Sequence, residues 1–459
     1  MQTQKKYILS SLFISMIFFS CKKYVEVQPK GKITPTTVSD YQLLLNNTTI
    51  WNVTWGTTEY LTDDIGITDA TLLTKIAARE IYSIYQFSDY YYQVSQDDPE
   101  WNSFYKQIYT ANVIINGLPT ATSGTDAQKQ QMTAEAKVHR AYAYLCLVNQ
   151  YAKQYDPSSA DTALGVPLLL EPNYTQSLKR ASIKTIYSQI LNDLNSSVSA
   201  LPSLPSNKAA PSQAAAFALL ARTYLYMGDY ANALTNANKS LAIQSTLLDL
   251  NNYPSTGSMP GFALPLARNT SEVILLKACG SQYQDEPLVA SSEVLQLFGT
   301  KDLRYVFYTY DGPVLGDPPG RYFAYFAPLE PRNEGPTVGE MMLIKAECLA
   351  RTAQGQSGLA VVNTLRKARF KPADYADLTA SSDLQALILI LQERRKELFC
   401  RGSRLIDLKR LNLDPAMAKT VSHPFGAQTL TLAPGSNRYI YPIPQSVIGS
   451  NPEIVQNPR

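Results

Sequence analysis

The chain has 459 residues, of which 45% are hydrophobic and 17% are charged, a composition typical of a large globular protein. Its 41 basic and 38 acidic residues leave a net charge of only +3, so neither nucleic acid nor an anionic membrane surface is expected as a partner. Tyrosine is abundant, with 30 copies, and its flat ring and hydroxyl suit wet recognition surfaces, although most of these rings are expected to line helix-packing faces.

The N-terminus has the features of an export signal. Lys5 and Lys6 form a short basic region, and residues 7–20 form a stretch of apolar and small residues that is too short to span a bilayer comfortably. We therefore predict a signal peptide over residues 1–20, which is removed on maturation and takes no part in the fold.

The end of this signal resembles a bacterial lipobox. Ser20 stands directly before Cys21, although Phe18 occupies a position where Leu is usual. We predict that Cys21 becomes the acylated N-terminus and that residues 21–40 form a polar tether. An ordinary signal peptide followed by an incidental cysteine is the alternative.

Helical periodicity dominates the first half of the mature chain. Apolar residues recur at i, i+3, i+4 and i+7 over residues 100–118, and a second strong helix is predicted over 134–151. The Pro-containing segment 165–172 breaks the pattern, which resumes over 182–201.

The second half contains paired helices. Residues 211–241 have tetratricopeptide spacing, with small residues that let two antiparallel helices approach closely and a Gly-Asp turn between them. A looser pair is predicted over 339–369, and 383–411 adds a long last helix and its continuation. The Pro-rich segment 439–459 is expected to be non-helical.

These elements predict a mostly α fold over residues 41–459, an irregular tetratricopeptide-like helical scaffold. Its helix pairs, at about 134–241 and 339–411, are separated by a loop-rich insertion over 251–335, which holds nine of the 28 prolines. Residues 272–277 are its predicted strand, so β structure is minor. Long loops held on a helical scaffold usually carry function, so this insertion is the predicted ligand-binding part.

Six sequence features occur in order over nearly the whole mature chain. They are Trp101-x-x-x-Tyr105-x-x-Ile108-x-x-x-Asn112; Arg140-Ala-Tyr142-x-Tyr144 with Gly165-Val-Pro-Leu168; Tyr226-Met-Gly-Asp229; Glu340 to Glu347 with Val362-Asn363-x-x-Arg366; Glu393-Arg-Arg-Lys-Glu-Leu398 with Gly402-x-Arg404-x-x-Asp407; and Pro442-Ile-Pro-Gln445 with Asn451-Pro452. Behind a lipoprotein signal, this set resembles the SusD/RagB family of outer-membrane lipoproteins from Gram-negative glycan-foraging bacteria. Cys400 departs from the family pattern, which is usually rich in Phe or Ala there.

The resemblance implies a receptor and not an enzyme. Such a protein captures a nutrient, a glycan in the first instance, and delivers it to a TonB-dependent SusC-like outer-membrane transporter on which it sits as a lid. The resemblance also implies a position on the outer face of the outer membrane, held by lipid on Cys21. No cofactor is expected, and a peptide or another nutrient stays open as the ligand.

Few residues suggest catalysis or metal binding. The chain has only two histidines, His139 and His423, and it lacks a zinc-protease motif, a phosphate-binding glycine loop and a serine-hydrolase elbow. No metal site is therefore predicted, and bound calcium is left open. The four cysteines beyond residue 21 are interpreted as buried hydrophobes, with one disulfide left open because the compartment is oxidising: Cys146, Cys279, Cys348 and Cys400.

Paired carboxylates keep a hydrolase open as an alternative, because a glycosidase needs only two of them at a fixed separation. Adjacent carboxylates cannot flank a bond from opposite sides, and acidic doublets are usually solvated loop residues. The third alternative is a repeat scaffold that binds only proteins. The doublets are Asp63-Asp64, Asp97-Asp98 and Asp285-Glu286.

Candidate ligand residues lie in two aromatic-rich regions. A sugar ring has apolar faces and a rim of hydroxyls, so its site combines aromatic rings with carboxylates and amides. Three consecutive tyrosines in the first region point in different directions, so at least one should be exposed. Trp101 is the member best explained by helix packing. The candidates are Trp51, Trp55, Asp63, Asp64, Tyr90, Tyr91, Tyr92 and Trp101 in the first region, and Arg321, Tyr322 and Tyr325 within 305–326 in the second.

Overall fold

The structure is a computed structural model that describes residues 34–279, 287–324 and 332–459. The predicted signal peptide, the lipidation site Cys21 and most of the predicted tether lie outside the described residues, and so does the candidate ligand residue Tyr325.

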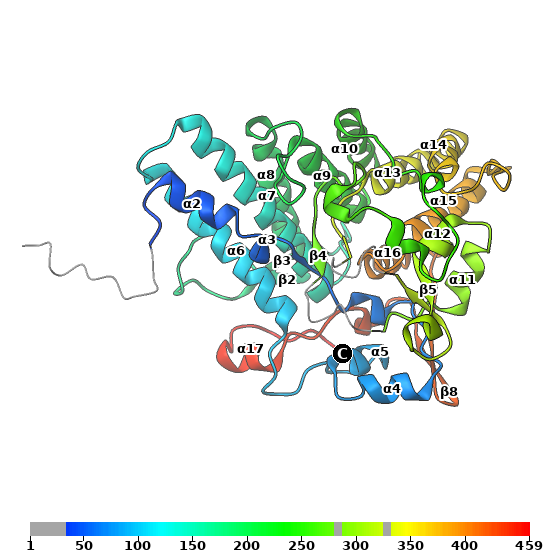
Figure 1. Ribbon diagram of the computed structural model, residues 1–459. Helices are drawn as coiled ribbons and strands as arrows, with labels where there is room; N and C mark the ends of the chain where they lie inside the picture. The colour runs from blue at the N-terminus through cyan, green and yellow to red at the C-terminus, as the bar shows by residue number, and fades with distance from the viewer. Residues whose placement is uncertain (1–33, 280–286, 325–331) are drawn as a thin grey trace, which may run out of the picture.

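Long helices form a curved row across the molecule, and each packs against the next one in the row as far as the helix over residues 383–397 (Figure 1). The predicted helical segments are confirmed, and so is the mostly α, tetratricopeptide-like fold. The row comprises α6 (Pro99–Gly117), α7 (Asp126–Tyr151), α8 (Ile183–Ser197), α9 (Gln213–Met227), α10 (Tyr230–Ile243), α13 (Val338–Arg351), α14 (Gly355–Lys367), α15 (Asp383–Glu397) and α16 (Arg404–Leu411).

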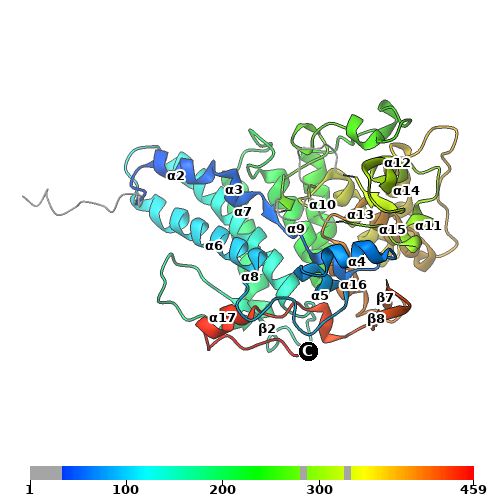
Figure 2. The same cartoon turned by 60° about the horizontal axis from the view of Figure 1, so that its bottom comes forward.

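Shorter elements cover one side of this row, seen from below in Figure 2. The short helices are α2 (Val38–Leu45), α3 (Thr48–Trp51), α4 (Ala70–Ile76), α5 (Glu80–Tyr85), α11 (Ser292–Phe298), α12 (Leu303–Phe307) and α17 (Gln445–Ser450). The strands pair as β1 (Val53–Thr54) with β4 (Ala278–Cys279), β2 (Leu164–Pro167) with β3 (Arg180–Ser182), β5 (Thr309–Asp311) with β6 (Arg321–Phe323), and β7 (Val421–Phe425) with β8 (Gln428–Leu432). Helix α2 starts within the segment predicted as tether.

Side-chain caps explain where the long helices begin. Thr125 starts α7 with a capping box, in which its hydroxyl accepts from the Gln128 amide and the Gln128 side chain accepts from the Thr125 amide. Ser212 caps α9 and Asp229 caps α10 in the same manner, by accepting a hydrogen bond from a backbone amide of the first turn. Gly228 makes the turn between α9 and α10 at φ +77°, a left-handed conformation that favours glycine.

The predicted strand over 272–277 is wrong. Its amides bond to separate partners: Ile274 N donates to Pro336 O at 2.9 Å, Leu276 N to Lys208 O at 2.7 Å, and Lys277 N to Asn333 Oδ1 at 2.9 Å. The apolar run resembles a strand in sequence, but its amides bond alternately to residues 333–336 and to Lys208, so no continuous ladder forms. The regular pairing starts only at Ala278, in β4.

The C-terminal part holds structure that the sequence did not predict. Strands β7 and β8 form a hairpin, and the ring of Tyr85 in α5 stacks on His423 in β7 at 4.2 Å between centroids. The N-terminal and C-terminal parts of the chain therefore pack together in the lower layer of Figure 1. The segment 439–459 was predicted to be non-helical, but it contains α17.

Candidate functional site

The structure brings the two aromatic-rich regions together. Ser291 N donates to Asp64 O at 2.8 Å, and Gly66 N donates to Val289 O at 2.9 Å. On its other side the same segment pairs with β6, because Ala290 N donates to Arg321 O at 2.8 Å. The segment before α11 thus links the first region, at Asp64, to the second region, at Arg321.

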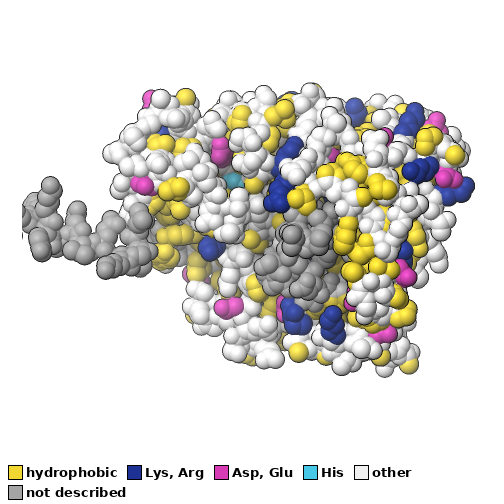
Figure 3. All heavy atoms as spheres, in the orientation of Figure 1, with side chains coloured by type: hydrophobic (Ala, Val, Ile, Leu, Met, Phe, Trp, Pro, Cys, Tyr) yellow, Lys and Arg dark blue, Asp and Glu magenta, His cyan; other side chains and the backbone are white. Residues whose placement is uncertain are grey.

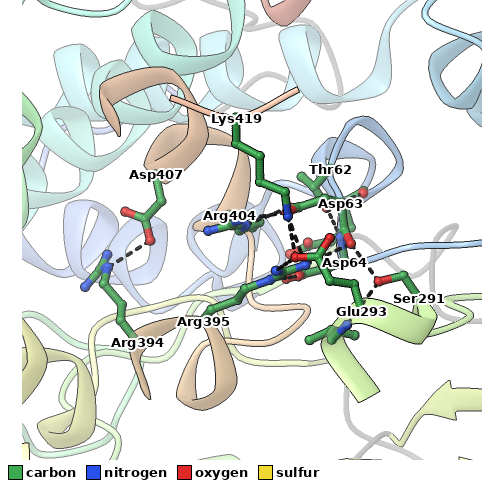
Figure 4. A network of polar contacts seen from close by, with 12 residues as sticks. Thr62, Asp63, Asp64, Ser291, Glu293, Arg394, Arg395, Arg404, Asp407 and Lys419 are labelled. Atoms are coloured by element: carbon green, nitrogen blue, oxygen red, sulfur yellow. Dashed lines mark hydrogen bonds and ion pairs between the residues drawn. The ribbon is translucent and has the colours of Figure 1, made fainter. Parts of the chain in front are cut away.

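Side-chain ion pairs strengthen this link (Figure 4). Arg395, on α15, donates to Asp64 Oδ1 at 2.6 Å and to Glu293 Oε1 at 2.5 Å, so one guanidinium joins the first region to α11. Arg404 holds both oxygens of Asp63, at 2.8 and 2.9 Å. Lys419 donates to Asp63 Oδ2 as well, at 2.6 Å.

These contacts determine how the two acidic side chains ionise. Burial opposes ionisation of Asp63, but Arg404, Arg395 and Lys419 together outweigh it and hold the pKa of that carboxyl well below its usual range. Burial raises the pKa of Asp64, and Arg395 and Arg404 offset this rise only in part. Both side chains are buried, at 4% and 1% exposure, so the expectation that Asp63 and Asp64 contact a ligand is corrected: they fasten loops.

Burial also corrects the expectation for most aromatic candidates of the first region. The exposed fractions of Trp51 and Trp55 are 1% each, and Tyr91, Tyr92 and Trp101 are buried as well. Trp51 stacks on His139, Trp101 packs against Tyr105 and Tyr151, and Tyr91 packs on Tyr441. These rings complete the core between the helices and the lower layer, and a sugar ring has no access to their faces.

Tyr90 is the exception among the three consecutive tyrosines. It is 52% exposed, whereas Tyr91 and Tyr92 are both buried, so the expectation that at least one of the three is exposed is confirmed. Its ring lies in the loop between α5 and α6, so it stays a candidate for ligand contact.

The β5–β6 hairpin carries the accessible aromatic group. The Tyr310 ring stacks on Tyr322 across the hairpin, with 5.5 Å between centroids and 25° between planes. Tyr322 is 2% exposed and lies beneath Tyr310. The expectation that Tyr322 itself contacts a ligand is therefore corrected: it supports the Tyr310 ring. Arg321 lies over the ring of Tyr305, with 4.4 Å from its guanidinium carbon to the centroid.

Two acidic side chains lie beside these rings. Asp317 accepts a hydrogen bond from the Tyr310 hydroxyl at 3.0 Å, and Asp311 is exposed at the end of β5. We refer to Tyr305, Tyr310, Asp311, Asp317 and Arg321 as the hairpin platform. Of the predicted ligand residues, only Arg321 belongs to it. Tyr305 and Tyr310 lie within the predicted region 305–326 but were not singled out from the sequence; Tyr305 lies on α12, and only Tyr310 pairs with Tyr322 across the hairpin.

Exposed apolar side chains surround the platform. Phe262, Val314 and Leu315 are 40%, 42% and 55% exposed. In the space-filling view, hydrophobic side chains gather on the right half of the face, over the region of α12 and β5 (Figure 3). An apolar surface beside half-buried Tyr, Asp and Arg can stack on a ring and hydrogen-bond its substituents.

The two acidic doublets that lie within the described residues, Asp63-Asp64 and Asp97-Asp98, give the hydrolase alternative no support. Asp98 caps α6 by accepting from the amides of Glu100 at 2.8 Å and Trp101 at 3.2 Å, and burial raises its pKa to about 6. Its neighbour Asp97 is exposed. Asp285 and Glu286 lie outside the described residues.

The other groups singled out in the sequence have structural positions. Cys146, Cys279, Cys348 and Cys400 are free and buried. Across residues 34–279, 287–324 and 332–459, no group of three or more His, Cys, Asp or Glu is arranged to hold a metal ion. Within the same ranges, no helix has the length and hydrophobicity needed to cross a bilayer.

Two family models match the chain. The SusD-like model described as "Starch-binding associating with outer membrane" matches residues 23–225, and the SusD family model matches residues 338–459. A SusD-like protein of Bacteroides ovatus is 25% identical over 245 residues, which cover 50% of this chain and 41% of that relative. The match thus spans less than half of the relative's length. The chain belongs to the SusD/RagB family.

Solved structures with the same fold cover nearly the whole chain. A putative sugar-binding protein of Bacteroides vulgatus has a TM-score of 0.71 at 20% identity, over 93% of this chain and 99% of its own. A SusD superfamily protein of Bacteroides fragilis has a TM-score of 0.72 at 20% identity, over 92% and 100%. A laminarin-binding SusD-like protein has a TM-score of 0.62 at 22% identity, over 92% and 99%. At these identities the likeness defines the fold.

Proposed function

We propose that the protein is a cell-surface glycan-binding protein, and that the hairpin platform is its principal contact with the ligand. The observation that carries this proposal is the half-buried Tyr310 ring, stacked on Tyr322 and fixed through its hydroxyl to Asp317. A ring supported from below loses little conformational freedom when a sugar stacks on its outer face. The names of relatives, a laminarin-binding protein among them, support the same ligand class.

Polar groups on the platform suit the rim of a sugar. Asp311 is exposed and accepts hydrogen bonds, whereas Arg321 donates three of them to Thr309 and one to Tyr305 O, so it positions the tyrosine ring more than it reads hydroxyls. A ligand that stacks on Tyr310 would therefore form its hydrogen bonds mainly with carboxylates.

The first prediction tests the platform. Tyr310→Ala is expected to weaken binding of the recognised polysaccharide by about tenfold or more, the loss typical of a truncated aromatic anchor. The chain from residue 22 onward is titrated against laminarin, starch and a wider polysaccharide panel by calorimetry. Tyr174→Ala is the matched control, because Tyr174 is 86% exposed and lies in the loop between β2 and β3.

Two outcomes would contradict this proposal. If a polysaccharide binds and neither Tyr310→Ala nor Tyr305→Ala weakens it, the platform is not the site. If no polysaccharide binds and a turnover assay on the same panel releases products, the paired-carboxylate hydrolase is the better reading.

The second prediction concerns membrane attachment and delivery. We infer that residues 1–20 are a signal peptide, that lipid on Cys21 anchors the protein through the tether 21–40, and that the bound glycan passes to a SusC-like, TonB-dependent barrel. The family description "associating with outer membrane" supports this location. A single acyl chain binds membranes only marginally, so stable anchoring needs at least two.

Fractionation and co-purification test this arrangement together. Tagged wild type is expected in the membrane fraction with an outer-membrane barrel protein, whereas Cys21→Ala should become soluble. A Cys21→Ala variant that stays with membranes, beside a wild type that takes up no labelled lipid, would contradict the anchor. Repeated recovery of the wild type alone in mild detergent would contradict the transporter partnership.

A further inference from the structure

A second, separate pocket lies between α2, α3, α7 and the loop 206–210. Its volume is about 330 Å³, at the lower end of the range for small-ligand sites, roughly 300–1,000 Å³. It shares no residue with the hairpin platform. Its lining is mainly polar and includes Gln42, Trp51, Gln131, Glu135, His139 and Asn207.

The charge and the orientation of the His139 ring follow from the residues around it. Its Nδ1 lies 3.1 Å from Lys277 Nζ, and because burial lowers the pKa of Lys277 to about 7, the lysine nitrogen can donate to Nδ1 as an ammonium or accept from it as a neutral amine. Burial, helped by Lys277, holds the pKa of His139 well below its usual range, which keeps the imidazole neutral. The ring is fixed in orientation by stacking on Trp51, at 4.5 Å and 16°.

Because Lys277 engages Nδ1, Nε2 is the ring nitrogen of His139 that is left for the pocket. The side chain is 2% exposed, and no hydrogen-bond partner of Nε2 is found among the described residues. A polar ring nitrogen without a protein partner is satisfied by water or by a ligand. Because His139 lines the pocket, the pocket is where such a partner would be.

Glu135 offers a complementary acceptor one helical turn earlier. Residues four apart on a helix share a face, so the Glu135 carboxylate and the His139 ring line the pocket together. The Glu135 carboxylate accepts from Gln131 at 3.0 Å, and no ion pair to it is found within the described part of the chain. Burial raises its pKa.

This lining selects for a neutral ligand rich in hydroxyls. An anion would meet the Glu135 carboxylate, and a cation would meet Lys277 behind the imidazole. A sugar hydroxyl both donates and accepts, so neighbouring hydroxyls can pair with Nε2 of His139 in either tautomer and donate to Glu135, while the amides of Gln42 and Gln131 supply either role. Trp51 is 1% exposed and gives no stacking face, so recognition here depends on hydrogen bonds.

We propose that this pocket is a second binding site, which takes a single sugar unit through His139, Glu135 and the surrounding amides. The site stands on its own lining and does not require the hairpin platform to bind glycan.

Histidine NMR tests the proposal directly, because the chain has only two histidines. The wild type is titrated with glucose, galactose, mannose and xylose, each as the free monosaccharide. At least one is expected to shift the ring signals of His139 and to leave those of His423, which is buried in the β7–β8 hairpin, unchanged. Signals are assigned with His139→Phe, which keeps a ring against Trp51.

Variants then locate the contact. Glu135→Gln is expected to weaken the active monosaccharide by about tenfold, as for loss of a charge-assisted hydrogen bond, and Gln131→Ala by less. Glu171→Gln, an exposed Glu outside both sites, should change nothing. Unchanged His423 signals show that each variant is folded.

The proposal is overturned if no monosaccharide shifts the His139 signals up to its solubility limit, or if Glu135→Gln and Gln131→Ala both bind like the wild type. Tyr310→Ala should leave this titration unaffected, so failure of the platform and failure of the pocket are separate results.

Discussion

Replacing Arg395 with Met is expected to lower the free energy of unfolding by about 3–5 kcal/mol, the usual cost of removing one partner from a buried ion pair. The Arg395 side chain is 7% exposed and is paired with Asp63, Asp64 and Glu293. Met keeps a similar length and packs well, so the loss comes from leaving the Asp64 carboxylate buried without its strongest partner. Denaturant titration measures the change.

The same substitution should weaken glycan binding by the folded protein. Arg395 ties the first aromatic region to α11, and the segment before α11 is paired with β6 of the hairpin platform (Figure 4). Arg438→Met is the matched control, because its pair with Asp89 is exposed and such pairs contribute only about 0–1 kcal/mol. Equal stability of the two variants would contradict the structural role of the network.

Trp55→Ala is the second variant with a large expected effect, about 3–5 kcal/mol of lost stability. The ring is 1% exposed, and its indole N–H donates to Cys146 O at 3.3 Å. Gly402 packs directly against it: a Cβ there would lie 2.8 Å from Trp55 Cε3. Removing the ring leaves a cavity that this tightly packed site cannot easily fill. Thermal or denaturant unfolding measures the loss.

A measurement of glycan affinity distinguishes a core position of Trp55 from the ligand contact that the sequence predicted. The folded fraction of Trp55→Ala should bind polysaccharide with wild-type affinity, because the ring lies beneath the surface. Tyr90→Ala serves as control, since it removes an exposed ring of the same region and should change stability by no more than about 0.5 kcal/mol. Preserved stability in Trp55→Ala, with lost affinity, would restore Trp55 as a contact.

Local patterns in the sequence were enough to place the long helices. Periodic apolar residues, capping residues such as Thr125 and Ser212, and the glycine turn at Gly228 depend only on neighbours in the chain. Six ordered motifs also indicated the family.

The fifth motif shows where such local reasoning ends. Leu384 and Ile388, two apolar residues at helical spacing in α15, are 53% and 40% exposed. The charges of the motif are instead buried: Glu393 and Glu397 both pair with Arg304 of α12. Charges turn inward here because a partner from a distant segment compensates their burial, and no helical period contains that information.

The sequence by itself determined the helices, their order and the aromatic character of two loop regions. Only the tertiary structure decided which aromatic rings reach the surface, because burial depends on the segments that pack over a ring. Trp51 and Trp55 lie under the helices and Tyr310 lies outside Tyr322, although all are aromatic residues in loop-rich sequence. Asp63 and Asp64 hold loops together for the same reason. Their partners Arg395 and Arg404 lie more than 300 residues further along the chain and form ion pairs with them only in the folded protein.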